Sequence, residues 1–231
     1  MKKVIVRSAL VAVVGLGLSV SNAFATPSNL YDILGISGTE VYTDTGAESV
    51  TLTDTDGSDD SATAFLFLEA AGFASTNTFG IYNLSNPGNF LEVFKGSDSP
   101  LTSATLVFDV NTNEVWKSTD AGTKVDLGSL SFGFYLTTQE LGGKTYYTQT
   151  GLNTDGIDHA MIFDTSDKKV GGLLGSNVVI AFEDKYGGDD MDYNDLVIGM
   201  TDVKPVPEPA TMMLFGVGLA GLAGVRRRAK K

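Results

Sequence analysis

The chain has 231 residues, a formal net charge of −12 at pH 7 and no cysteine. This acidity argues against nucleic acid and anionic lipid surfaces as partners, because both are negatively charged themselves. Without cysteine the protein has no disulfide bonds, and its 42% hydrophobic content is enough for one folded domain with its own core.

Residues 1–25 have the features of a secretory signal peptide. A basic start precedes an apolar run from Ala9 to Leu18, and Ala23-Phe24-Ala25 forms a small-residue cleavage site. The alternative, a buried N-terminal helix, explains neither the order of charges nor the cleavage site. We therefore expect residues 26–204 to form an exported domain. Residues 26–207 hold 8 basic and 27 acidic side chains, a net charge of −19, which suits divalent cations.

The exported region shows no long stretch of helical periodicity. Short runs of alternating apolar residues, such as 130–136, are separated by glycine, asparagine, aspartate and serine, and this pattern is typical of strands. We predict an all-β protein with a single antiparallel β-sandwich or jelly-roll-like domain. A short helix is expected at 69–74, and strands are expected at 49–53, 63–69, 79–84, 90–95, 102–110, 130–136, 144–150, 160–164, 178–182 and 195–200.

An acidic turn is expected at 53–60, TDTDGSDD. Gly57 suits a backbone conformation with positive φ in a tight reversal. This segment is interpreted either as a second cation site or as the polar tip of a hairpin.

The densest acidic cluster lies in residues 182–197, FEDKYGGDDMDYNDLV, which contain six carboxylates and one lysine. Two unit charges about 4 Å apart repel each other by roughly 4 kcal/mol at an effective dielectric constant near 20. The apolar runs at 178–182 and 196–198 are interpreted as strands that fix the ends of the loop. A bound cation is therefore expected there, and a solvated acidic turn is the alternative.

Calcium is the cation that this loop suits best, because it binds six to eight oxygen atoms from carboxylates, amides and backbone carbonyls. The D-x-D-x-N pattern at 190–194 can curl around one ion, and Gly187-Gly188 allows the backbone to fold back. The flanking strands and Asp195 at the sixth loop position distinguish the loop from an EF-hand. The predicted ligands are Glu183, Asp184, Asp189, Asp190, Asp192, Asn194 and Asp195, with Asp158 from a preceding loop.

Other chemistries have weaker support. One histidine and no cysteine cannot build the usual tetrahedral zinc site. His159 could act as a base oriented by Asp155 or Asp158, but there is no G-x-S-x-G nucleophile motif, and we expect the ring to make hydrogen bonds inside the sandwich. Carboxylates such as Glu92 are available to a glycosidase, although sequence spacing reveals no cleft. We therefore predict a non-enzymatic protein.

The C-terminal segment 205–231 has three parts in a fixed order: Pro207-Glu208-Pro209, an apolar or small-residue run from Ala210 to Val225, and a basic tail with Arg226, Arg227 and Arg228. Such a run is about 24 Å long as a helix, slightly short of a hydrocarbon core of about 30 Å. It resembles the PEP-CTERM sorting signal of Gram-negative bacteria that produce exopolysaccharide. That resemblance implies recognition by an exosortase-type enzyme after transient insertion into the inner membrane. The alternative is an ordinary C-terminal anchor.

The exported core also resembles a known family, the domain-of-unknown-function family numbered 4114. The resemblance is carried by FGIYN, LEVFKG, FGFYL, YYTQTGLNTDGIDHAMIF and above all AFEDKYGGDDMDYNDLV. It implies a β-sandwich on secreted, adhesin-like proteins, and it implies that the site includes Glu183, Asp184, Asp192, Asn194 and Asp195.

These observations predict an exported, non-enzymatic, calcium-binding β-sandwich of the cell surface or the exopolysaccharide matrix. A calcium-dependent carbohydrate-binding module, lectin-like or adhesin-like, is the alternative, followed by a polysaccharide hydrolase. An exosortase-type enzyme and extracellular polysaccharide are the expected partners, and nucleic acid is not.

Overall fold

The structure, a computed structural model, describes residues 29–69, 74–167, 172–188 and 190–207. The predicted signal peptide, most of the short helix expected at 69–74, Asp189, and the C-terminal apolar run with its basic tail lie outside the described residues. Among the residues that are described, none of the helices has the length and hydrophobicity needed to cross a bilayer.

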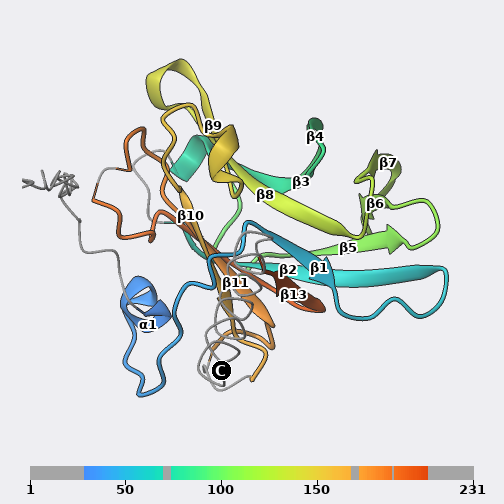
Figure 1. The fold of residues 1–231 in the computed structure, drawn as a ribbon, viewed down its shortest axis with the longest axis horizontal. Helices are drawn as coiled ribbons and strands as arrows, with labels where there is room; N and C mark the ends of the chain where they lie inside the picture. Colours follow the sequence, from blue (N-terminus) through green and yellow to red (C-terminus); the bar gives the residue numbers. More distant parts are fainter. Residues whose placement is uncertain (1–28, 70–73, 168–171, 189, 208–231) are drawn as a thin grey trace, which may run out of the picture.

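The described chain is nearly all β, and its strands form two antiparallel sheets, which confirms the predicted sandwich (Figure 1). The first sheet runs β10-β11-β12-β2-β5-β6-β7, formed by Ala160–Asp164, Val178–Phe182, Leu196–Met200, Asp59–Glu69, Ser103–Asp109, Glu114–Lys117 and Asp120–Asp126. The second runs β13-β1-β8-β3-β4, with β9 beside β8, formed by Val203–Val206, Ser49–Leu52, Ser131–Thr138, Thr78–Asn83, Asn86–Lys95 and Lys144–Tyr147. The short helices are α1 (Leu30–Leu34), η1 (Ala74–Thr76), η2 (Glu140–Gly142) and η3 (Thr150–Leu152).

All ten predicted strands are present, with shifts at their ends. Strands β6, β7 and β13 and helix α1 were not predicted. β7 is exposed over nearly its whole length and carries almost no apolar alternation. β13 contains Pro205, which is tolerated because this strand lies at the edge of its sheet.

The main core lies between the sheets, and both contribute alternate residues to it. On β8 the inward residues are Phe132, Phe134 and Leu136, as the alternation in the sequence predicted. On β11, Val178, Ile180 and Phe182 face the same core. Period-two alternation therefore decides which side chains pack between the sheets.

A second apolar cluster covers the opposite face of β10, β11 and β12. Val179 and Ala181 of β11 pack there with Leu30 and Ile33 of α1. Since β11 is buried on both faces, every one of its five residues is apolar and inaccessible to solvent. The strand that leads into the acidic loop is thus held firmly in the molecule.

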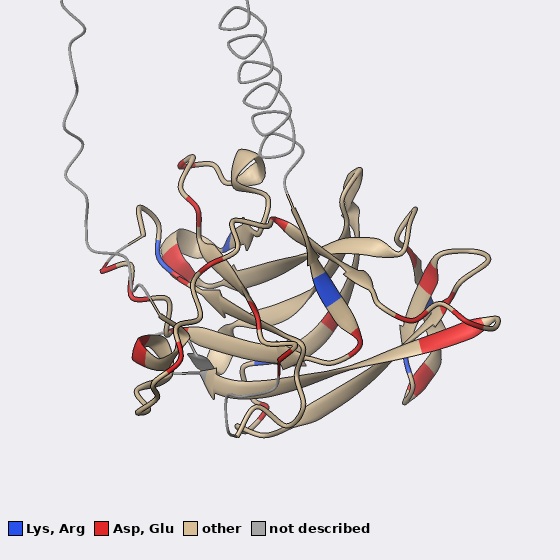
Figure 2. Cartoon of the chain, turned by 60° about the horizontal axis from the view of Figure 1, so that its bottom comes forward, with Lys and Arg blue, Asp and Glu red and all other residues tan. Residues whose placement is uncertain are grey.

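The two acidic turns lie at opposite ends of the molecule (Figure 1). The 53–58 turn connects β1 to the far end of β2, and Gly57 has a φ of 94°, as predicted for a tight reversal. Acidic residues occupy loops all over the described fold, whereas basic residues are sparse (Figure 2).

Candidate metal site

The acidic loop, residues 183–195, joins the ends of two adjacent central strands. Phe182 pairs with Leu196 in the β11–β12 ladder, so both ends of the loop are fixed directly. Gly187 and Gly188 adopt positive φ angles of 81° and 76°, and the Met191 N–H donates to the Gly188 carbonyl at 2.8 Å. The glycine pair therefore turns the backbone back on itself, as the sequence indicated.

Three carboxylates of this loop meet at one point. Oxygen atoms of Glu183, Asp190 and Asp192 all lie within 4.8 Å of one another. Two oxygens on opposite sides of a calcium ion, each 2.3–2.6 Å from it, are about 5 Å apart. The three side chains are therefore spaced so that a single calcium ion could contact all of them.

Glu183 is the buried member of this group, with 0% of its surface exposed. One of its carboxylate oxygens, Oε1, accepts a hydrogen bond from the Tyr193 N–H at 2.7 Å, whereas Oε2 has no partner among the described residues. Burial, which outweighs that hydrogen bond, and to a smaller extent repulsion by Asp195, Asp192 and Asp190 raise the pKa of Glu183 to about 8. A buried anionic oxygen with no donor is costly unless a cation or a proton compensates it.

Asn194 supports this group indirectly. Its backbone N–H and its side-chain amide both donate to the carboxylate of Asp192. Of the D-x-D-x-N pattern, the two aspartates join Glu183 and the asparagine holds one of them in place.

Asp184 and Asp195 form a separate pair. The Asp184 N–H donates to Asp195 Oδ2 at 3.0 Å, and the Asn77 amide donates to Asp184 Oδ2 at 3.1 Å. Asp184 Oδ1 and Asn77 Oδ1 are buried without a partner in the described part of the chain. Burial, followed by the nearby Asp184 carboxylate, raises the pKa of Asp195 to about 6.

Asp158 lies apart from both groups. Its side chain is exposed and accepts a hydrogen bond from the Ala160 N–H, while its carbonyl accepts one from the Tyr193 hydroxyl at 2.9 Å. The Asp158 carbonyl therefore contacts Tyr193 of the loop, and the Asp158 carboxylate is not one of the three that meet at one point.

His159 contacts the start of the acidic loop. It is fully buried, its Nε2 lies 2.8 Å from Asp155 Oδ2, and its Nδ1 lies 3.3 Å from the Glu183 carbonyl. The Tyr146 ring stacks on the imidazole with a centroid distance of 3.8 Å. Both ring nitrogens thus face hydrogen-bond acceptors of the protein, in keeping with the expected hydrogen bonding inside the sandwich.

Asp155 and Glu140 accept hydrogen bonds from the backbone of the first turn of the acidic loop. The Gly187 N–H donates to Asp155 Oδ2 at 3.0 Å, and the Tyr186 N–H donates to Glu140 Oε2 at 2.6 Å. Although burial opposes the shift, hydrogen bonds from Gly187 and His159 lower the pKa of Asp155. Glu140 and Asn77 were not singled out in the sequence, since neither lies near an acidic motif and only the three-dimensional fold brings them to the loop.

Comparison with known families agrees with the resemblances found in the sequence. Residues 105–202 match the family model described as Domain of unknown function (DUF4114), and this match includes the whole acidic loop, Asp155 and His159. Residues 205–228 match the model of the PEP-CTERM protein-sorting motif. No curated protein and no solved structure matches the chain. The chain is therefore a PEP-CTERM sorting-motif protein, exported and sorted by an exosortase-type enzyme, whose β-sandwich core resembles the DUF4114 family.

Proposed function

We propose that this exported protein is a non-enzymatic β-sandwich that binds calcium in its acidic loop and acts at the cell surface or in the extracellular polysaccharide matrix. Glu183, Asp190 and Asp192 hold the ion, and the second carboxylate pair, Asp184 and Asp195, adds negative potential close by. The observation that carries the proposal is the buried Glu183 carboxylate: its Oε2 has no hydrogen-bond donor among the described residues, and one of its oxygens lies within 4.8 Å of oxygens of two other carboxylates.

Calcium in this position has a structural effect. It links the end of β11 to the tip of the loop, whose conformation includes positive φ angles at Met191 and Tyr193. Residues other than glycine rarely adopt that conformation, so the loop needs additional interactions to maintain it. In a cysteine-free exported domain, a bound ion supplies a crosslink that a disulfide provides in other proteins.

Calcium should raise the melting temperature of the purified full-length protein, kept in mild detergent, by about 5–10 °C relative to EDTA. A hundredfold excess over Kd adds about 2.7 kcal/mol, and 1 kcal/mol shifts the melting temperature of a domain of this size by about 2–4 °C. Differential scanning calorimetry measures the shift. Magnesium at the same concentration should have a smaller effect, because it demands tighter octahedral geometry.

The matched pair of variants for this experiment is Asp190→Asn and Asp56→Asn. Both residues are exposed aspartates, but Asp56 lies in the acidic turn at the other end of the molecule. Asp190→Asn should remove most of the calcium effect, and Asp56→Asn should leave it intact. An equal loss in both variants would mean that calcium acts through the general negative charge, and the proposed site would be wrong.

In EDTA, the protein should become less stable as the pH rises from about 5 to 8. The pKa of Glu183 is raised to about 8 in the folded state, so the folded protein retains a proton that the unfolded chain releases near pH 4.5. That contribution is complete below the unfolded-state pKa and is lost as the pH rises through the folded-state value. Asp195, with a pKa of about 6, acts in the same direction. Urea denaturation across this range measures the trend, and stability that increases with pH would contradict it.

A calcium-dependent lectin is the second candidate, and the exposure of Asp190 favours it. The metal group extends from the buried Glu183 to the exposed Asp190, so one side of the ion would be open to a sugar hydroxyl. Binding to a glycan array that disappears in EDTA and in Asp190→Asn would support this function.

A further inference from the structure

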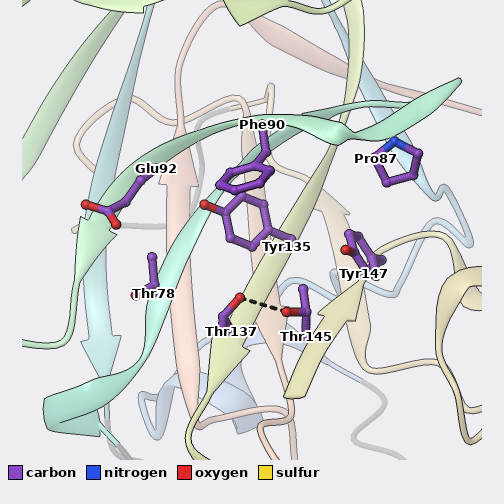
Figure 3. Close-up of a pocket in the computed structure, with 8 residues that line it drawn as sticks. All are labelled: Thr78, Pro87, Phe90, Glu92, Tyr135, Thr137, Thr145 and Tyr147. Carbon is purple, nitrogen blue, oxygen red and sulfur yellow. Dashed lines mark hydrogen bonds between the residues drawn. The ribbon is translucent and has the colours of Figure 1, made fainter. Parts of the chain in front are cut away.

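The outer face of the six-stranded sheet carries a groove that is separate from the acidic loop (Figure 3). Its volume is about 180 Å³, and its lining comes from β3, β4, β8 and β9. The rings of Phe90, Tyr135 and Tyr147 and the ring of Pro87 provide its apolar surface. The DUF4114 match begins at residue 105, so the β3 and β4 part of the groove lies outside the matched region.

Strand register places the lining residues in rows across the sheet. One row runs from Glu92 through Gly80 and Tyr135 to Tyr147. The neighbouring row contains Thr78, Thr137 and Thr145. Small threonines beside large aromatic rings create the depression.

The aromatic rings are held in fixed positions. Tyr135 lies directly over Gly80, where even a methyl group would come within 2.6 Å of its ring. Phe90 meets the same tyrosine edge-on with a centroid distance of 5.3 Å, and Tyr147 meets Tyr82 edge-on at 5.0 Å. A ligand would therefore find the rings already positioned, which reduces the entropy cost of binding.

Polar groups surround these rings, and several of them are available. Among the described residues, the Thr78 hydroxyl makes no hydrogen bond, and neither does the hydroxyl of Tyr135, a residue that is only 4% exposed. Thr137 and Thr145 bond to each other at 2.9 Å, and Glu92 forms an ion pair with Lys95 at 3.2 Å. The groove thus combines apolar ring surface with hydroxyls and one carboxylate.

We propose that this groove binds one or two hexose rings of a neutral glycan, independently of calcium. A pyranose ring has an apolar C–H face that packs on aromatic rings and a rim of hydroxyls that both donate and accept hydrogen bonds. A proline-rich peptide offers mainly carbonyl acceptors, which the Glu92 carboxylate would repel. An anionic glycan is disfavoured by the same carboxylate and by the net charge of the chain.

A second hollow indicates that the ligand is a chain longer than one sugar. It has a volume of about 340 Å³, adjoins the first along β4 and shares Phe90 and Glu92 with it. Lys117, Asp120 and Thr123 contribute polar groups to its lining. A glycan that crosses Phe90 would contact both hollows.

The first hollow lacks the pair of carboxyl groups that hydrolysis of a glycan requires, although the second hollow adds Asp120. Glycosidases place two carboxyl groups on either side of the scissile bond, about 5–9.5 Å apart. Among the residues that line the first hollow, Glu92 is the only carboxylate.

Binding of neutral tetrasaccharides of glucose, mannose and galactose to the full-length protein in mild detergent tests the proposal. Phe90→Ala should weaken binding of the best tetrasaccharide about fivefold, and adding Tyr147→Ala should weaken it further. Tyr186→Ala is the matched control. Tyr186 is 46% exposed, which is similar to the 53% exposure of Phe90, but Tyr186 lies on the acidic loop. Isothermal titration calorimetry in calcium and in EDTA should give the same affinity, and melting temperatures verify that the variants fold.

Three results would overturn the proposal. The first is that none of these tetrasaccharides binds at about 10 mM, a concentration high enough to detect a millimolar Kd. The second is binding that EDTA and Asp190→Asn abolish while Phe90→Ala has no effect, which places the sugar at the metal loop. The third is a groove that binds a proline-rich peptide and no sugar. Failure of calcium binding alone would leave the groove proposal intact.

Discussion

Replacing Gly80 with alanine should destabilise the protein by about 3 kcal/mol, the upper part of the range for overpacking a closely packed site. The added methyl group would lie 2.2 Å from the carbonyl oxygen of Leu91 and 2.6 Å from the Tyr135 ring. The ring can shift, but the carbonyl belongs to the backbone of the neighbouring strand β4, so relief requires a distortion of the sheet. Urea denaturation in calcium should show the loss as a lower midpoint with an unchanged slope.

Gly88→Ala is the control for this variant. Gly88 lies on β4, the strand that pairs with β3. The atom nearest to an added methyl group would be Asn86 Oδ1 at 3.4 Å. The exposed site should tolerate alanine within about 0.5 kcal/mol. Equal effects in the two variants would mean that general loss of backbone freedom at glycine, and not the contact with Leu91, determines the result.

Much of the sandwich could be predicted because its central strands have two distinct faces. In β8, strict alternation marks the residues that enter the core, and turn residues mark both ends of the strand. The β6–β7 hairpin could not be found in this way, since β7 buries almost nothing and is stabilised mainly by its pairing with β6. Helix α1 has only five residues, and it forms where Leu30 and Ile33 can cover β11.

The acidic loop, too, could be predicted from the sequence only in part. Its position between two strands and its glycine turn follow from local sequence. The division of its acids into two groups does not, because neighbours in sequence such as Glu183 and Asp184 are both buried but join different groups in the folded loop. Asn77 and Glu140 come from distant segments and contact the loop only through tertiary structure. The groove was missed because its lining residues come from four strands that the sequence does not reveal to be neighbours.

The positions of the acidic loop and the groove explain how one molecule could use one site for its stability and another for binding a glycan. The acidic loop follows β11 in the seven-stranded sheet, and the groove lies on the outer face of the other sheet. Their lining residues do not overlap among the described parts of the chain. Calcium would therefore change stability, while glycan affinity would follow Phe90 and Tyr147.

Glu183→Gln should have opposite effects on stability with and without calcium. In EDTA at pH 8, the variant should be more stable than the parent by on the order of 2 kcal/mol, because a neutral amide replaces a buried carboxylate whose ionised form is disfavoured. Glutamine can keep the bond from the Tyr193 N–H through its own oxygen, and its amide nitrogen can donate to the neighbouring aspartates.

In millimolar calcium the same variant should be the less stable protein, since it has lost the innermost ligand and with it most of the calcium-dependent gain of about 2.7 kcal/mol. Urea denaturation of both proteins under the two conditions measures the reversal, and Asp56→Asn, which removes a charge from the distant acidic turn, should show none. If Glu183→Gln were destabilised equally in EDTA and in calcium, Glu183 would serve only as an acceptor for Tyr193. A reversal of sign, in contrast, requires that the buried carboxylate is unfavourable by itself and favourable with the ion, which is the defining property of a metal ligand in a protein interior.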